Sequence, residues 1–184
     1  MNEIRISDSL YLNRASLRDA AVLVSLLNDP VYAQMTQHIP YPYATEDAKQ
    51  WIHLNLAKKD TDLTKVWCIR ACYQGQTTTQ LCGMIGVPRL SFDEGWVEVG
   101  YWVGKAHWGK GMATQSVHAL SKWISTNPSV QKIIAHTFTN NTASGRVLEK
   151  NGFSKTKKIK NYISKNGKMI SAFYWEKPLS NYLS

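Results

Sequence analysis

The segment 98–114 constrains the fold most, because a strand pattern, a glycine turn and a helix pattern follow one another in it. Apolar residues recur at helical spacing from Ala113 to Ile124. A helix N-terminus leaves several backbone N–H groups without intrahelical partners and carries partial positive charge. Gly109 and Gly111 would let the backbone approach a ligand closely. The segment therefore predicts a phosphate site that suits a pyrophosphate.

Two glycines before a helix are also compatible with an ordinary strand-to-helix turn. The common nucleotide motifs ask for Lys followed by Ser or Thr after the last glycine, or for G-x-G-x-x-G within a βαβ unit. The turn at residues 108–114 has neither pattern. If it binds phosphate, it belongs to a different class of phosphate site.

Hydrophobic periodicity and turn residues divide the rest of the chain into short elements. The order predicts an α/β domain whose middle is antiparallel sheet. Asn166-Gly167 suits a type I′ turn. Since no linker or repeat interrupts the pattern, we expect one domain over residues 1–184. The predicted helices are 16–27, 45–56, 109–125 and 141–150; the predicted strands are 10–14, 65–73, 80–92, 96–103, 131–138, 154–163 and 169–177.

Charge and composition narrow the possible partners and the location. Lys and Arg number 22 against 13 for Asp and Glu, a net charge of +9, which favours an anionic partner such as nucleic acid, an acidic protein or a polyphosphate ligand. We expect a cytoplasmic protein without a membrane span, because the start lacks a basic and apolar leader. The cysteines and histidines show no spacing typical of a metal site, so we expect no metal and assign His118 and His136 no role.

Three blocks of the sequence together resemble the GNAT superfamily of N-acetyltransferases, and within it the RimJ/RimL branch that acetylates ribosomal-protein N-termini. In order, they are Glu98-Val-Gly-Tyr-Trp-Val103, Trp108-Gly-Lys-Gly-Met-Ala-Thr114 and Asn141-Thr-Ala-Ser-Gly-Arg-Val-Leu-Glu-Lys-Asn-Gly-Phe153. The resemblance implies a mixed, mostly antiparallel twisted sheet of about six or seven strands with about four helices. It also implies a splay between strands 96–103 and 131–138, where acetyl-CoA enters.

The superfamily's acyl-CoA motif is Arg or Gln, two residues, Gly, one residue, then Gly or Ala. It maps onto Trp108, Gly111 and Ala113, and Trp108 departs from the first position in a way that resembles this branch. By resemblance, backbone amides hold the pyrophosphate and a strand edge pairs with the pantetheine arm. The implied acetyl-CoA residues are Tyr101, Trp102, Val103, Trp108, Gly109, Lys110, Gly111, Met112, Ala113, Thr114, Asn141 and Ser144.

Direct acetyl transfer needs a base, a donor to the thioester oxygen and an acid for the leaving thiolate. By resemblance, Glu98 is the base, directly or through a water, and partial burial would raise its pKa towards neutral. The backbone N–H of Trp102 is the implied oxyanion donor, and Ser144 the implied acid. The alternatives are a structural acid for Glu98 and helix capping for Asn141 and Ser144.

The resemblance places the acceptor pocket between residues 32–43 and 162–174. Tyr41, Tyr43, Glu98 and Tyr162 are the implied pocket residues, and Trp51 is expected in the core. Lysines at positions 150, 155, 157, 158, 160, 165 and 168 either attract an acidic acceptor or the CoA phosphates, or form a solvated face.

These observations predict an acetyl-CoA-dependent N-acetyltransferase that acts on a primary amine, most readily a protein N-terminus. Amino acids, polyamines and aminoglycoside-like amines are alternative acceptors. Two alternatives come from other classes: a non-catalytic CoA sensor, and a basic nucleic-acid-binding module. No recognisable RNA motif or helix-turn-helix supports the last one. Members of this branch often dimerise, so the resemblance also implies a homodimer.

Overall fold

A computed structural model describes residues 3–59, 62–73 and 79–179. It contains one eight-stranded sheet in the order β1-β2-β3-β4-β5-β6-β8-β7, in which only β5 and β6 are parallel. The mostly antiparallel α/β class is confirmed, with more strands than expected. The strands are β1 (Glu3–Arg5), β2 (Leu10–Asn13), β3 (Val66–Ala71), β4 (Gln80–Ser91), β5 (Trp96–Val103), β6 (Lys132–Phe138), β7 (Ser154–Lys165) and β8 (Lys168–Pro178).

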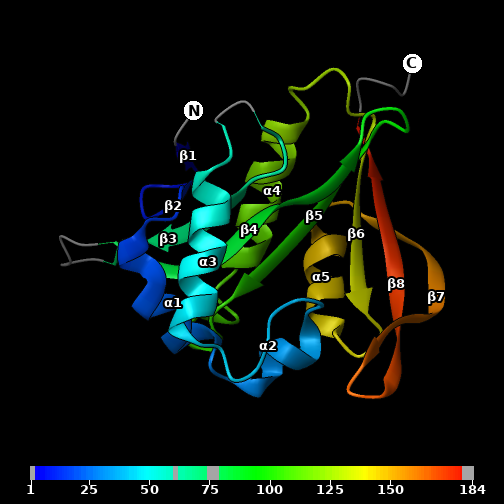
Figure 1. Cartoon of the computed structure of the whole chain (residues 1–184). Coiled ribbons are helices and arrows are strands. Elements are labelled where there is room, and N and C mark those ends of the chain that lie inside the picture. The colour runs from blue at the N-terminus through cyan, green and yellow to red at the C-terminus, as the bar shows by residue number, and fades with distance from the viewer. Residues whose placement is uncertain (1–2, 60–61, 74–78, 180–184) are drawn as a thin grey trace.

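Within the described residues, five α-helices and two single 3-10 turns connect the strands (Figure 1). Four of the helices lie within the predicted ranges. They are α1 (Ala20–Leu27), α2 (Pro30–Met35), α3 (Thr45–Leu56), α4 (Met112–Ile124) and α5 (Thr142–Lys150), with 3-10 turns η1 (Leu17–Asp19) and η2 (Lys105–His107). No helix in the described ranges is both long enough and apolar enough to span a bilayer.

The helix α2 was not predicted, because Asn28-Asp29-Pro30 suggests a helix end. In the structure the same residues begin a helix: the Asp29 carboxylate accepts a hydrogen bond from Val31 N at 2.9 Å, and Pro30 occupies the first helical turn. Proline is favoured there because the missing N–H would have no intrahelical partner. Residues 32–35 of the helix belong to the range 32–43, which was expected to wall the acceptor pocket.

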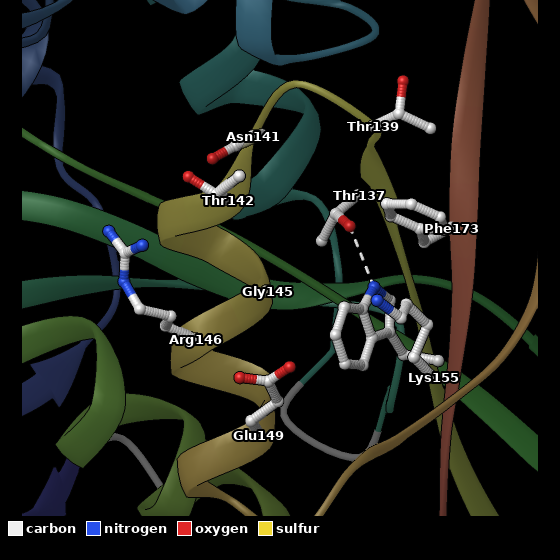
Figure 2. A pocket seen from close by; sticks show the side chains of 10 residues that line it. Thr137, Thr139, Asn141, Thr142, Gly145, Arg146, Glu149, Lys155 and Phe173 are labelled. Carbon is white, nitrogen blue, oxygen red and sulfur yellow. Dashed lines mark hydrogen bonds between the residues drawn. The ribbon is translucent and has the colours of Figure 1, made fainter.

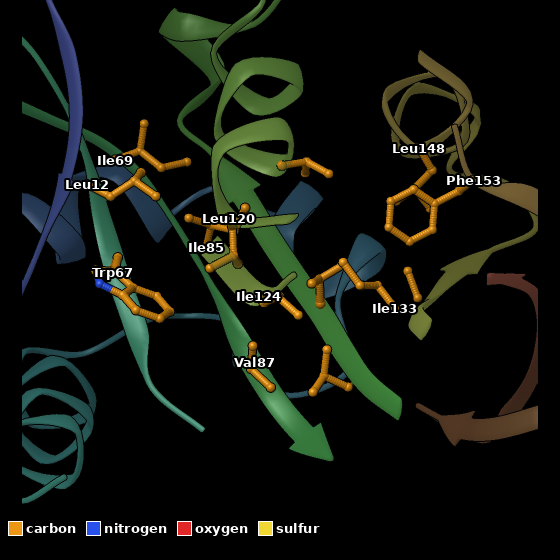
Figure 3. Packing of buried hydrophobic residues seen from close by; sticks show 14 of the residues in the cluster. Leu12, Trp67, Ile69, Ile85, Val87, Leu120, Ile124, Ile133, Leu148 and Phe153 are labelled. Carbon is orange, nitrogen blue, oxygen red and sulfur yellow. The ribbon is translucent and has the colours of Figure 1, made fainter. Parts of the chain in front are cut away.

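Two hydrophobic clusters cover the two faces of the sheet. One joins α4 and α5 to the sheet and includes Trp67, Ile85 and Leu120 (Figure 3). The other joins α1, α2 and α3 to the opposite face and includes Leu23 and Ile52. Along β5, β6 and β8, alternate residues therefore point to the α4–α5 face or to the α1–α3 face.

The tail forms the predicted hairpin. Asn166 and Gly167 have φ of 51° and 73°, as a type I′ turn requires at both central positions. The hairpin places β7 at the sheet edge beyond β8. The prediction of one domain over 1–184 stays a prediction, since the structure leaves out both chain ends.

Candidate active site

The sheet opens between β5 and β6. Their parallel pairing ends at Glu98 and Ile134, although β5 stays paired with β4 to Val103 and β6 stays paired with β8 to Phe138. Both strands therefore continue, but apart from each other (Figure 1). The predicted splay between residues 96–103 and 131–138 is confirmed.

Hydrogen-bond alternation decides which β5 groups face this gap. Gly104 N donates to Cys82 O at 2.7 Å, and in an antiparallel ladder every second residue repeats this direction. The register then pairs the Trp102 N–H with Met84 on β4, whereas Tyr101 and Val103 direct their backbone groups towards the gap. The expectation that the Trp102 amide donates to a thioester oxygen is therefore wrong, because that amide is committed to the sheet.

The indole of Trp108 helps to shape the same edge. Its Nε1 donates to Val103 O at 2.6 Å, and the Tyr32 hydroxyl donates to the same oxygen at 3.3 Å. The Val103 carbonyl is thus occupied, while its N–H still faces the gap. Trp108 remains 49% exposed beside the glycine turn.

The glycine turn leads into the N-terminus of α4. Gly109 and Gly111 both have φ of +75°, a conformation that favours glycine, and Gly111 is the N-cap without a side-chain capping bond. The first bond into the helix runs from Gln115 N to Gly111 O, at 3.0 Å. A Cβ built on Gly109 would meet nothing within 4 Å. The turn thus presents uncapped amides beside open space, which fits an anionic phosphate group.

On the α4–α5 face, Ser144 meets Tyr101. The Tyr101 hydroxyl lies 2.9 Å from Ser144 Oγ and donates to Ser144 O at 3.1 Å. Asn141 Oδ1 accepts from Ser144 N at 3.1 Å, so the capping role expected for Asn141 is confirmed. Burial raises the pKa of Tyr101, so its hydroxyl keeps its proton at neutral pH. The Tyr101 hydroxyl and the Ser144 hydroxyl together form a protonated pair at the gap.

On the α1–α3 face, Glu98 is buried and accepts two charge-assisted bonds. His136 Nδ1 lies 2.7 Å from Oε1, and Arg89 Nε lies 2.5 Å from Oε2. Burial acts to raise the pKa of Glu98, but the hydrogen bonds and charges of His136 and Arg89 outweigh it and lower the pKa. The expected rise towards neutral is therefore wrong.

His136 is the residue that sequence reasoning missed, since it was assigned no role. Its ring stacks on Tyr162, with centroids 5.0 Å apart and an interplanar angle of 16°, and meets Tyr174 edge-on at 5.3 Å. Glu98 and Ile134 are register partners, so their side chains lie on the same face of the sheet. Because alternate residues of a strand share a face, His136, two residues after Ile134, lies on that face too. Only the register of the sheet makes that relation visible.

The residues predicted to line the acceptor pocket differ in burial and in contacts. Tyr41 is 53% exposed and Tyr162 stacks on His136, so both stay candidates. Tyr43 is 7% exposed and belongs to the hydrophobic cluster of α1–α3, so its placement in a pocket is wrong. Trp51 packs against that cluster, as expected. Lys165 Nζ donates to Thr36 O, joining the hairpin to the end of α2.

A separate cavity of ≈ 170 Å³ lies between α5 and the strands β6, β7 and β8 (Figure 2). Two of its lining residues are joined by a hydrogen bond from Trp175 Nε1 to Thr137 Oγ1, at 2.8 Å. Asn141 is the only residue of the predicted acetyl-CoA set that lines this cavity. The cavity is therefore distinct from the gap between β5 and β6.

Cys68, Cys72 and Cys82 form no disulfide with one another, and burial raises the pKa of Cys68 to about 12. Within the described residues, no three His, Cys, Asp or Glu side chains cluster as metal ligands would.

Comparison with known proteins agrees with this geometry. Residues 9–154 match the family described as Acetyltransferase (GNAT) domain. An uncharacterized N-acetyltransferase p20 from Bacillus licheniformis is 24% identical over 93% of each chain. The solved structures that resemble this chain include RimL, a ribosomal L7/L12 alpha-N-protein acetyltransferase in complex with coenzyme A. The TM-score is 0.84 at 18% sequence identity, and the match covers 97% of this chain and 98% of that chain. A spermidine N-acetyltransferase from Vibrio cholerae has a TM-score of 0.77 at 16% identity, over 97% and 100% of the chains.

Proposed function

The chain belongs to the GNAT family of acetyltransferases, and we propose on that premise that it acetylates the free amine at a protein N-terminus. Acetyl-CoA is the co-substrate of this family. The observation that carries the proposal is the juxtaposition of the β5–β6 gap with the uncapped α4 N-terminus. The backbone of Tyr101 and Val103 would pair with the pantetheine arm, and the amides of residues 109–114 would hold the pyrophosphate.

The chemistry needs little from side chains beyond proton transfer. The amine attacks the thioester carbonyl carbon, the carbon–sulfur bond breaks, and sulfur leaves with the electron pair. We assign the proton for this thiolate to Ser144, backed by the Tyr101 hydroxyl at 2.9 Å. The gap-facing N–H of Tyr101 takes over the oxyanion role first expected for Trp102, and the N–H of Val103 remains for the pantetheine arm.

Charge around the acceptor side favours a peptide over a polyamine. A polycation would need unpaired carboxylates, but Glu98 is already bonded to Arg89 and His136. Lys157 lies over the Tyr174 ring at 4.7 Å, on the same face as His136. A cationic acceptor would meet this positive charge, whereas a peptide with acidic residues after its free amine would be attracted by it.

A panel of acceptors tests the proposal. The peptide Ser-Asp-Glu-Ala-Tyr, its neutral analogue Ser-Asn-Gln-Ala-Tyr, an N-terminally blocked copy and spermidine are compared through release of the CoA thiol. We expect kcat/KM to fall from the acidic to the neutral peptide, and spermidine to react at least about tenfold more slowly than the acidic peptide. The blocked peptide should not react. Spermidine as the best acceptor would contradict the proposal, and tight acetyl-CoA binding without any turnover would point to a CoA sensor.

Two adjacent lysines provide a matched control for the charge argument. Lys157 pairs with Tyr174 on the acceptor face, whereas Lys158 pairs with Phe173 on the α4–α5 face, and both are exposed. Lys157→Gln should raise KM for the acidic peptide and leave KM for the neutral one unchanged. Lys158→Gln should change neither.

A further inference from the structure

We propose that the general base is the Nε2 atom of His136 and that Glu98 is its positioning residue. This inference rests on the proposed function, since it concerns the amine that the enzyme would acetylate. It departs from the sequence analysis, in which the family resemblance implied Glu98 as the base and the spacing of the histidines gave His136 no role.

The hydrogen bonds of Glu98 disqualify it as the proton acceptor. Its Oε2 accepts from Arg89 Nε at 2.5 Å and its Oε1 from His136 Nδ1 at 2.7 Å. Each of its two oxygens therefore already has a hydrogen-bond donor, and the side chain is 9% exposed. Taking a proton would also remove the charge with which Glu98 holds Arg89 and orients His136.

The same bonds fix the tautomer of His136. An ionised carboxylate can only accept hydrogen bonds, so Nδ1 must carry the proton that it shares with Glu98. In neutral imidazole the free lone pair then belongs to Nε2, the atom remote from Glu98. Among the described residues, Nε2 has no hydrogen-bond partner, and the side chain of His136 is 13% exposed. A carboxylate that orients an imidazole in this way is a recurrent device for general-base catalysis.

Neighbouring rings hold the imidazole in place. Tyr162 of β7 stacks on one side and Tyr174 of β8 packs edge-on. Arg89 of β4 also donates to the Tyr162 hydroxyl at 3.3 Å, so it braces both Glu98 and the stacked ring. The titratable and charged groups around His136 are thus Glu98, Arg89, Tyr162 and Tyr174. Beyond them lie Lys157, over the Tyr174 ring at 4.7 Å, and Glu176, two residues along β8 on the same face.

The position of His136 suits an attack across the gap. It lies two residues beyond Ile134, where β5 and β6 separate, and on the α1–α3 face. Ser144 and Tyr101 lie on the opposite, α4–α5 face. An amine entering from the first face would give its proton to Nε2 as its nitrogen bonds to the acetyl carbon. Sulfur would leave with the electron pair and take a proton from the second face.

The test uses His136→Ala in the full chain, with the peptide Ser-Asp-Glu-Ala-Tyr and acetyl-CoA. We expect kcat/KM at neutral pH to fall by about 10²–10³-fold. We also expect loss of the acid limb of the pH–rate profile, and partial rescue by added imidazole. His118→Ala is the matched control, because His118 is exposed on α4, and it should leave rate and profile unchanged. His136→Gln serves if the alanine variant fails to fold, since its amide can still donate to Glu98.

The outcomes separate this inference from the proposed function. A wild-type enzyme that does not acetylate the peptide contradicts the proposed function before any variant is made. A His136 variant that keeps the acid limb overturns the inference, whether its rate falls or not, because a merely structural role lowers the rate without moving the profile. In each variant, the rise in melting temperature with acetyl-CoA reports whether the co-substrate still binds.

Discussion

At the scale of single residues, environment decides what Glu98 can do. The residue type and the strand position suit a base, but a base needs a free lone pair and a pKa near the working pH. In the structure Arg89 and His136 occupy both carboxylate oxygens. The carboxylate is thereby held ionised, and we assign the role of base to the His136 imidazole that it orients.

Stability should therefore depend on the charge of Glu98. Because its folded pKa lies below the ordinary value of 4.5, its contribution is present above that value and is lost as pH falls through the lower folded pKa. We predict that Glu98→Gln lowers the free energy of unfolding by about 1–3 kcal/mol at neutral pH. The difference from wild type should shrink below about pH 4.5.

Urea unfolding across a pH series measures this difference. The control is Glu46→Gln, since Glu46 is paired with Lys49 at the surface and its side chain is 82% exposed. Its substitution should change the free energy by less than about 0.5 kcal/mol. A Glu98→Gln deficit that persists unchanged into acid would show that the carboxylate charge is not the stabilising element.

Ser144 takes part in the N-cap of α5 and is also the proposed acid, and substitutions can separate these two roles. Its N–H takes part in the cap through Asn141, whereas its hydroxyl faces Tyr101. We predict that Ser144→Ala lowers kcat by about 10²-fold or more without weakening acetyl-CoA binding. Asn141→Ala should instead cost about 1 kcal/mol of stability through the lost cap. Steady-state kinetics with thermal melts distinguish the two, and an unaffected kcat in Ser144→Ala would remove the acid role.

Residue types and spacing could predict Ser144 and the glycine turn, because both are local. They could not predict that His136 meets Glu98, since 38 residues and a parallel strand pairing separate them. Nor could they show that the Trp102 amide points to β4, because that depends on the parity of the register. Local motifs can therefore be predicted from the sequence, whereas contacts that depend on the register of the sheet cannot.

At the scale of elements, strong periodic patterns gave α1, α3, α4 and α5 close to their observed ends. Three short elements were not predicted: β1 and η2 have three residues each, and α2 has six. None is long enough to show a period. The helix α2 matters for the site, since Tyr32 on it donates to Val103 O and the Thr36 carbonyl at its end accepts from Lys165.

The turn before α4 permits a test at this scale. Gly111 and Gly167 both have positive φ, 75° and 73°, and a Cβ at either position has room. Alanine at either position should therefore cost about 1–2 kcal/mol of stability from backbone strain alone. We predict that only Gly111→Ala also weakens acetyl-CoA binding, by about tenfold, because the strain moves amides that would hold the pyrophosphate.

Calorimetric titration of acetyl-CoA into both variants checks this prediction. Gly167→Ala is the matched control, since Gly167 lies in the turn of the β7–β8 hairpin. Equal affinity in the two variants would mean that the amides at the start of α4 do not hold the phosphates.

At the scale of the whole molecule, the splayed sheet places two kinds of chemistry on opposite faces of one gap. Glu98 and His136 lie on the face covered by α1–α3, and Tyr101 and Ser144 lie on the face covered by α4–α5. The contact between Lys165 and Thr36 joins the basic hairpin to α2 across the acceptor side. An acceptor and a thioester could thus approach from different directions.

A crystal structure of the protein with acetyl-CoA tests this arrangement most directly. We predict that the pyrophosphate lies on the amides of residues 109–114. The thioester should lie between β5 and β6, with His136 Nε2 facing its carbonyl carbon from one side and Ser144 near its sulfur on the other. Acetyl-CoA bound instead in the cavity beside α5, or with its thioester remote from both faces of the gap, would contradict the account.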